Sequence, residues 1–161
     1  MEFIRDVLWH YEITGPVSET KILAAAEDIL FRRLERQGEI RNPKDSEHFL
    51  RMRLGALLHE EFHILWLDNR HRILACQKLL TGTVDGASVH LREVVRAALQ
   101  VNASAAILAH NHPSGVPEPS GADSAITGEL KQALQLVGVR ILDHIIVSAD
   151  NCVSMASRGL I

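Results

Sequence analysis

One short segment constrains the fold of this chain more than any other. It reads His110-Asn111-His112-Pro113-Ser114-Gly115, then a proline-containing loop, then Ser120-Gly121-Ala122-Asp123. The apolar run at 103–109 predicts a buried strand leading into it. Because residues i and i+2 of a strand point the same way, His110 and His112 should leave the strand end side by side. The loop then returns the chain, so that Asp123 falls in the first turn of the following helix.

Two imidazoles and a carboxylate form a ligand set typical of a catalytic zinc ion, which keeps a fourth position for water. His-x-His alone is weak evidence in a chain with nine histidines. The longer pattern, in which Ser-x-x-Asp follows the second histidine after seven residues, is much more specific. The sequence therefore predicts a Zn²⁺ site with His110, His112 and Asp123 as ligands.

This pattern resembles the JAMM (MPN+) metallopeptidase motif, and its wording is similar to that of the RadC branch of the superfamily. Further landmarks of that branch follow in order: Glu60-Glu61-Phe62, Leu67-Asp68, Gly82-Thr83, Arg92-Glu93-Val94 and residues 142–147. One departure is Leu91, which stands where the family usually has proline. That position lies outside the predicted metal set.

The resemblance covers roughly residues 57–161 and implies an α/β fold. The expected architecture is a mixed sheet flanked by helices, JAMM/MPN-like and cytidine-deaminase-like. Residues 1–56 are expected to form a short helical N-terminal extension. Longer RadC relatives carry a fuller helical module there, so a DNA-binding module of that kind is expected to be absent or much reduced.

The resemblance also implies two catalytic roles. A glutamate two residues before phenylalanine, here Glu60, would act as the base that takes a proton from water and returns it to the leaving amine. Glu61 is the alternative, and strand alternation makes the choice consequential because neighbours point to opposite faces. Ser120 would stabilise the oxyanion. Ser-x-x-Asp is also a variant of the helix capping box, and the two roles could coexist in different rotamers of Ser120.

His144 is a candidate for supporting the metal ligands from behind, since ligating imidazoles usually donate their other N–H to a fixed acceptor. Asp143 is one possible acceptor. The alternative interpretation, a polar pair satisfied locally near a strand end, stays open.

Periodicity and turn signals predict the remaining elements. Residues 1–17 are expected to be an irregular arm, and Ser88 is a plausible cap for the third helix. The expected helices span about 18–37, 43–58, 90–101 and 121–136, and the expected strands 62–67, 72–79, 104–109, 139–147 and 152–155.

Composition bounds the class of protein. A chain of 161 residues with 47% apolar and 23% charged residues is typical of a globular domain. It has no apolar run near the ~18 residues of a membrane span and no signal-peptide pattern, so the expected location is cytoplasmic with no membrane partner. Cys76 and Cys152 lack metal or disulfide spacing, and we interpret both as reduced thiols.

A net charge of −3 argues against direct nucleic-acid binding, which needs a clustered basic surface. The most basic segment mixes both signs and is interpreted as a solvated helix face. Its charged residues are Lys21, Arg32, Arg33 and Arg36, opposed by Glu27, Asp28, Glu35 and Glu39.

Three functional hypotheses follow. The first is a zinc-dependent metallohydrolase that cleaves an amide bond in a peptide or protein substrate, including isopeptide bonds. The second is a RadC-like accessory or binding protein associated with DNA repair, with a structural or vestigial metal. The third is a non-catalytic scaffold, against which the complete ligand set argues. The sequence leaves the substrate and the oligomeric state open.

Overall fold

The computed structural model describes residues 3–5, 11–13, 15–37, 39–82 and 89–161. A central five-stranded sheet has the strand order β4-β3-β5-β6-β7. Its strands are β3 (Glu61–Leu67), β4 (Ile73–Thr81), β5 (Ala105–Asn111), β6 (Arg140–Val147) and β7 (Cys152–Ser154). Only the β5–β6 pair is parallel among these strands; the other neighbours are antiparallel. The expected mixed sheet is therefore confirmed.

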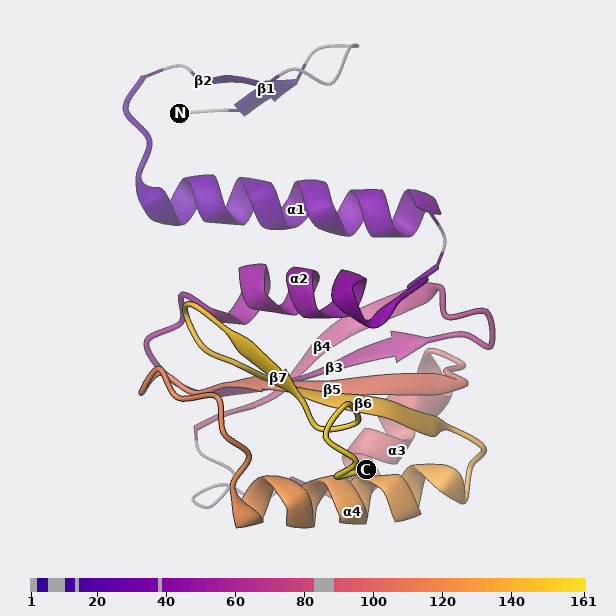
Figure 1. The fold of residues 1–161 in the computed structure, drawn as a ribbon. Helices are drawn as coiled ribbons and strands as arrows, with labels where there is room; N and C mark the ends of the chain where they lie inside the picture. Colours follow the sequence, from indigo (N-terminus) through magenta and orange to yellow (C-terminus); the bar gives the residue numbers. More distant parts are fainter. Residues whose placement is uncertain (1–2, 6–10, 14, 38, 83–88) are drawn as a thin grey trace.

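Helices cover both faces of the sheet (Figure 1). Helix α2 (Pro43–Leu54) lies on one face with α1 (Glu19–Gln37) stacked behind it, and α3 (Leu91–Gln100) and α4 (Gly121–Gln135) lie on the other. None of the described helices is long and apolar enough to cross a membrane.

Strand alternation divides the core into two apolar layers. On the α2 side, Phe49 and Leu50 pack against Leu65 of β3 and Ile145 of β6. On the opposite side the even-numbered residues of β3 pack against α3 and α4. That second cluster includes Phe62, Ile64, Trp66, Val94, Leu108, Ile126, Leu130 and Leu134. Strand β5 is buried along its whole length, which explains why its sequence reads as a continuous apolar run.

The parallel pair β5–β6 determines where the predicted metal set lies. Parallel neighbours need a crossover connection, and here the crossover contains α4. Helix α4 must therefore begin near the C-terminal end of β5. This brings the first turn of α4, with Asp123, back to the histidines that end β5.

Two expectations about the N-terminal part were wrong. Residues 1–17 are not simply irregular, because β1 (Phe3–Arg5) pairs antiparallel with β2 (Tyr11–Ile13). The second helix ends at Leu54 instead of extending to residue 58. At Gly55 an added Cβ would lie 2.6 Å from the carbonyl oxygen of Arg51 and 3.3 Å from that of Ser148. The β6–β7 turn thus lies close to the end of α2. Local sequence patterns cannot predict this contact because the two segments are far apart in the chain.

Side chains cap the starts of α1, α2 and α4, whereas the N-cap residue of α3, His90, makes no such bond. The side chain of Asn42 accepts from the Asp45 amide and Pro43 follows in the first turn. Ser18 accepts from the Lys21 amide at 3.4 Å. The expected cap Ser88 lies outside the described residues. The division of the chain near residue 56 stays a prediction, and α2 shares its hydrophobic core with the sheet.

Candidate metal centre

The site begins at the end of β5, where both predicted histidines emerge on one face. His110 is the penultimate residue of the strand and is buried. The His112 amide donates to the Val147 carbonyl at 2.8 Å, so the chain continues alongside β6 beyond the strand end. The two Nε2 atoms lie 2.9 Å apart. The predicted side-by-side arrangement of the imidazoles is present.

Asp123 reaches the histidines from the first turn of α4. Its Oδ1 lies 3.1 Å from Nε2 of His110, and its Oδ2 lies 3.6 Å from Nε2 of His112. A capping box holds the carboxylate in place: the Ser120 amide donates to Oδ2 at 2.7 Å, and the Asp123 amide donates to Ser120 Oγ at 3.1 Å.

The loop after β5 orients His112. Gly115 adopts φ +89°, a conformation that favours glycine, and its amide donates to the His112 carbonyl. The loop then places the Val116 carbonyl 2.9 Å from Nδ1 of His112. Since a carbonyl only accepts, Nδ1 carries the proton in this contact. The lone pair of neutral His112 is therefore on Nε2, the atom that faces Asp123.

A buried relay orients His110 in the same way. Nδ1 of His110 lies 2.8 Å from Nε2 of His144, and Nδ1 of His144 lies 2.6 Å from Oγ1 of Thr127. The Thr127 hydroxyl donates to the Asp123 carbonyl at 2.6 Å. One proton arrangement satisfies the relay: His110 donates to His144, and His144 donates to Thr127. This leaves the lone pair of His110 on Nε2 and ties His110 to the helix that carries Asp123.

Phe62 closes the inner side of the site. Its ring stacks on His110 with 5.9 Å between centroids and 9° between planes, and it meets His144 edge-on at 5.5 Å. Phe62 belongs to the apolar layer beneath α3 and α4. The histidines thus sit against dry packing on one side, which strengthens electrostatic interactions within the site.

The electrostatics match a cation site. Burial is the largest influence on Asp123 and raises its pKa, but its contacts with His110 and His112 and the hydrogen bond from the Ser120 amide outweigh burial and lower the pKa well below the ordinary value. The carboxylate is therefore ionised. Protonated His112 can donate from Nε2 to Asp123, which raises the pKa of His112; burial opposes that effect, and the charge of Glu60 adds to it.

The donor set fits a metal ion. One ligand atom from each of His110, His112 and Asp123 lies within 4.8 Å of the others. Ligands of a tetrahedral zinc site are separated by about 3.3 Å, given bond lengths near 2.0–2.1 Å. The separations of 2.9, 3.1 and 3.6 Å bracket that value. This group can hold a metal ion, and the identity of the ion stays a prediction.

A family model described as a RadC-like JAB domain matches residues 40–160. The chain belongs to this RadC-like family. It is 54% identical over 126 residues to a UPF0758 protein of Marinobacter nauticus and 55% identical over 128 residues to one of Nitrosococcus oceani. It is 48% identical over 148 residues to a UPF0758 protein of Xanthomonas oryzae pv. oryzae.

These alignments cover 78%, 80% and 90% of this chain, in the same order, and 56%, 57% and 66% of the relatives. The chain thus spans little more than half the length of the first two relatives. Their names state no activity. The comparisons establish the family of the RadC-like domain and leave its reaction to be argued from the site.

The two adjacent glutamates of the RadC-like domain have different surroundings. Glu61 forms hydrogen bonds with His59 at 3.0 Å and His63 at 2.8 Å, and its carboxylate lies 3.7 Å from Lys78 Nζ. Burial raises the pKa of Glu61, but these partners outweigh burial and lower it. Glu61 is thus engaged with three neighbouring cations or imidazoles, whereas the charge of Glu60 reaches His112; the choice of Glu60 as the base stays a prediction.

The adjacent residues Asp143 and His144 have separate roles, and only His144 contacts a predicted ligand. His144 supports His110 through the contact between their ring nitrogens. Asp143 was considered as an acceptor for a ligand imidazole, and that possibility is wrong. Its carboxylate accepts from the His144 amide, the Ser154 hydroxyl and the Ala156 amide, and so braces the turn after β7. Adjacent strand residues point to opposite faces, which separates the two roles.

Thr127 was not identified from the sequence. It lies four residues after Asp123 on the buried side of α4, and a threonine among apolar helix positions is a weak signal. Its importance depends on His144, which comes from a different element. No local pattern joins these two residues.

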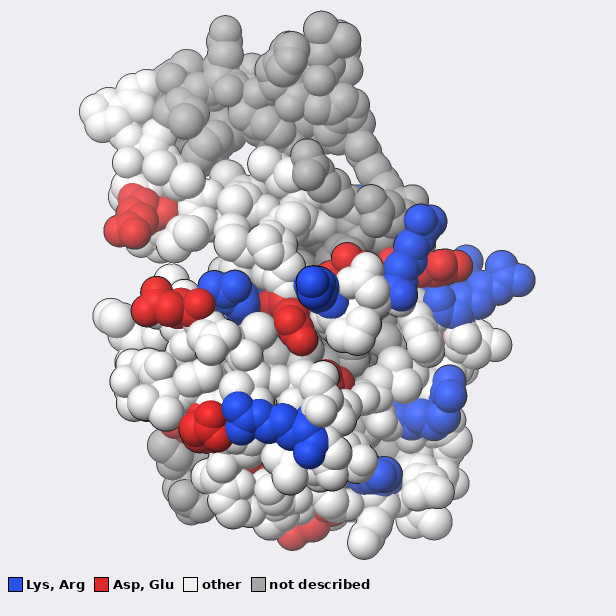
Figure 2. Space-filling view, viewed as in Figure 1, with Lys and Arg blue, Asp and Glu red and all other residues white. Residues whose placement is uncertain are grey.

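Charged side chains of both signs are interspersed on the face shown in Figure 2. On α1, Arg32 pairs with Asp28 four residues earlier. Between α1 and α2, Glu27 pairs with Arg53 at 2.8 Å. These pairs agree with the interpretation of the α1 segment as a mixed-sign surface, although several of its side chains lie outside the described residues.

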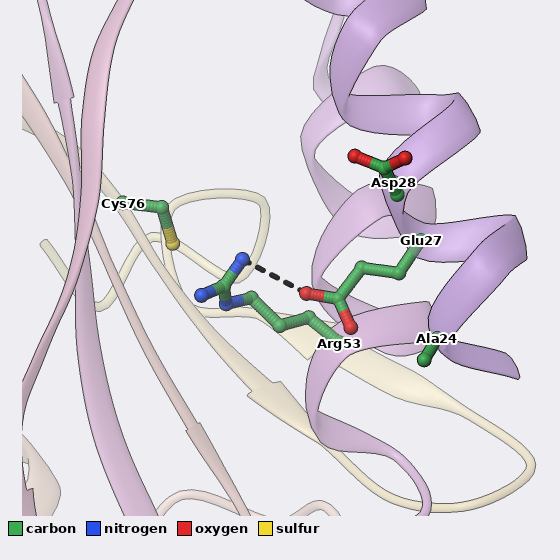
Figure 3. A pocket seen from close by; sticks show the side chains of 5 residues that line it. All are labelled: Ala24, Glu27, Asp28, Arg53 and Cys76. Atoms are coloured by element: carbon green, nitrogen blue, oxygen red, sulfur yellow. Dashed lines mark ion pairs between the residues drawn. The ribbon is translucent and has the colours of Figure 1, made fainter. Parts of the chain in front are cut away.

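A separate hollow of about 360 Å³ lies where α1, α2 and β4 meet (Figure 3). Its lining includes the Glu27–Arg53 ion pair and Cys76, towards which the guanidinium extends. Burial raises the pKa of the Cys76 thiol to about 11. A protonated thiol is a poor nucleophile and metal ligand, so we assign this hollow no part in the chemistry of the RadC-like domain.

Proposed function

We propose that this chain is a JAMM-type metallohydrolase that uses zinc to cleave peptide or isopeptide bonds in a peptide or protein substrate. The observation that carries the proposal is the convergence of His110, His112 and Asp123, with the charge of Glu60 beside His112. Membership of the RadC-like JAB-domain family supports it. The expected location of the protein is the cytoplasm.

The protein would hold zinc through Nε2 of His110, Nε2 of His112 and a carboxylate oxygen of Asp123. When bound, such an ion lowers the pKa of a water ligand toward about 7 and polarises a substrate carbonyl. The relay through His144 and the contact with Val116 keep both lone pairs directed at the site. The ligands are therefore oriented before a metal arrives.

Glu60 would accept a proton from the attacking water and deliver it to the leaving amine nitrogen. Ser120 would donate its hydroxyl hydrogen to the substrate carbonyl oxygen as that oxygen gains negative charge. The Ser120 Oγ already accepts from the Asp123 amide, but its own hydrogen is still available for donation.

The metal is tested by elemental mass spectrometry on protein purified without chelator and then supplied with zinc. We expect about one zinc per chain, lost in His112→Ala. The matched control is His48→Ala, because His48 is an exposed histidine of α2. No zinc in the unaltered protein would contradict the proposal.

The reaction is tested on zinc-loaded protein with two reporter sets, one containing peptide bonds and one containing isopeptide bonds to a lysine side chain. We expect Glu60→Gln to keep its zinc and lose turnover. Glu61→Gln is the neighbouring control and should retain turnover. A fully active Glu60→Gln variant would exclude the assigned base.

A further inference from the structure

The backbone around Glu60 is held in an unusual way. The β3–β5 ladder runs from Leu67↔Ala105 to Phe62↔His110 and does not extend to residues 59–61. Asn111, the last residue of β5, lies directly beyond that final pair. It is 2% exposed, so its amide must find partners within the protein.

The Asn111 side chain replaces the missing ladder. Its Oδ1 accepts from the Glu61 amide at 2.8 Å, and its Nδ2 donates to the His59 carbonyl at 2.8 Å. A carboxamide carries one acceptor and N–H donors in the same arrangement as a peptide group. These two hydrogen bonds hold the peptide groups immediately before and after Glu60.

The opposite edge of the same segment is also held. The Gly82 amide donates to the Glu60 carbonyl at 2.8 Å, and β4 pairs with β3 as far as Glu61↔Thr81. Gly82 has φ +112°, a conformation that favours glycine. Glu60 is thus fixed from the β4 side by Gly82 and from the β5 side by Asn111.

Fixing this short segment decides which carboxylate faces the metal ligands. Phe62 and His110 are direct ladder partners on the face covered by α4. Extended geometry at residues 60–62 puts Glu60 on that face and Glu61 on the other, where it pairs with His63. A slip by one residue would exchange the two glutamates.

We propose that Asn111 is a positioning residue that sets the register of residues 59–61 and so directs Glu60 towards the metal ligands. The catalytic consequence rests on the function proposed above. The structural part, that the Asn111 amide holds the Glu61 amide and the His59 carbonyl, stands independently. Because Asn111 lies between His110 and His112, the same end of β5 would position both the metal ligands and the base.

The test compares Asn111→Leu, which keeps the volume, with Asn111→Ala, which is smaller and tolerates repacking. Ser148→Ala is the matched control, because Ser148 is also buried and bonded to backbone, in the turn before β7. Amide hydrogen exchange of the full chain is followed residue by residue by NMR. We expect the Glu61 amide to lose protection by about tenfold in both Asn111 variants, as for one lost hydrogen bond, and not in the control.

Zinc content and turnover of the reporters complete the test. We expect the Asn111 variants to retain about one zinc per chain. Their kcat should fall by about 100-fold, as for a misplaced catalytic group, with little change in KM. Unchanged Glu61 protection, or wild-type kcat, would overturn the proposal. Loss of zinc in parallel with activity would overturn it as well, because the effect would then act through the ligands.

The exchange measurement separates the two proposals because it needs no turnover. Loss of Glu61 protection in protein that cleaves neither reporter set would support the positioning role of Asn111 and count against the hydrolase function. Active wild-type protein with fully active Asn111 variants would support the hydrolase function and overturn the positioning role.

Discussion

His110 and His144 are joined by a buried contact of 2.8 Å between Nδ1 of the first and Nε2 of the second. Thr127 continues that contact to the backbone of Asp123. One predicted ligand is therefore linked to another through two residues that would not touch the metal. Such supporting contacts orient ligands and tune their affinity for the ion.

Thr127→Val should weaken metal binding while leaving all three ligands in place. Valine has a similar shape but neither accepts from His144 nor donates to the Asp123 carbonyl. We expect a 10–100-fold loss of zinc affinity, of the order found for supporting residues in metal sites. Competition with a chromophoric chelator measures it. Thr20→Val, at an exposed position of α1, is the control. Equal zinc affinities in the two variants would disprove the role of the relay.

Ser120→Gly should separate the two roles of Ser120. Glycine is a good N-cap, so we expect a stability loss of only a few tenths of a kcal/mol. Loss of the hydroxyl should lower kcat about 100-fold or more if Ser120 stabilises the oxyanion. Urea unfolding and reporter kinetics provide the two readouts.

The comparison variant for Ser120 is Asn42→Ala, which removes the cap of α2. It should cost about 1 kcal/mol of stability without changing kcat. Normal kcat in Ser120→Gly would leave Ser120 with a capping role alone.

His144 should contribute a loss of stability to the metal-free protein as the pH falls from 6.5 towards 3. Burial is the main cause that lowers the pKa of His144 to about 3, and the charge of His110 lowers it further. The unfolded chain takes up this proton near pH 6.5 and the folded chain does not, so falling pH favours unfolding over this interval.

Urea unfolding at several pH values measures the effect. His144→Gln should make the slope of unfolding free energy against pH shallower. The change corresponds to up to about one fewer proton taken up on unfolding. His48→Gln, at an exposed position, should keep the original slope. Identical slopes in all three proteins would show that His144 does not contribute.

Leu130→Ala should destabilise the domain by about 2–5 kcal/mol, since it removes a fully buried side chain and leaves a cavity. Leu130 packs in the cluster that seats α4, the helix carrying Asp123. Leu136→Ala, at a residue 89% exposed, should change stability by less than about 0.5 kcal/mol. Denaturant unfolding of both variants tests the comparison, and similar losses would contradict this packing.

Much of the fold was predictable because the determining signals are local. Asn42-Pro43 opens α2, the buried run at 103–109 forms most of β5, and Gly138 follows the end of α4 with φ +77°. The antiparallel pair β1–β2 was missed because strands as short as these have too few residues to show alternation.

The sequence by itself determined the strand–loop–helix unit and the three candidate ligands, since two-residue spacing on a strand and a capping box on a helix are local geometry. Which glutamate accompanies them depends on the tertiary structure. Alternation says that Glu60 and Glu61 face opposite ways, but not which face holds the metal set. That depends on β3 lying beside β5 and on the hydrogen bonds of Asn111 with Glu61 and His59, which are 50 and 52 positions away in the sequence. Contacts over such distances form only when the sheet assembles, because packing of the whole core and not local preference holds them.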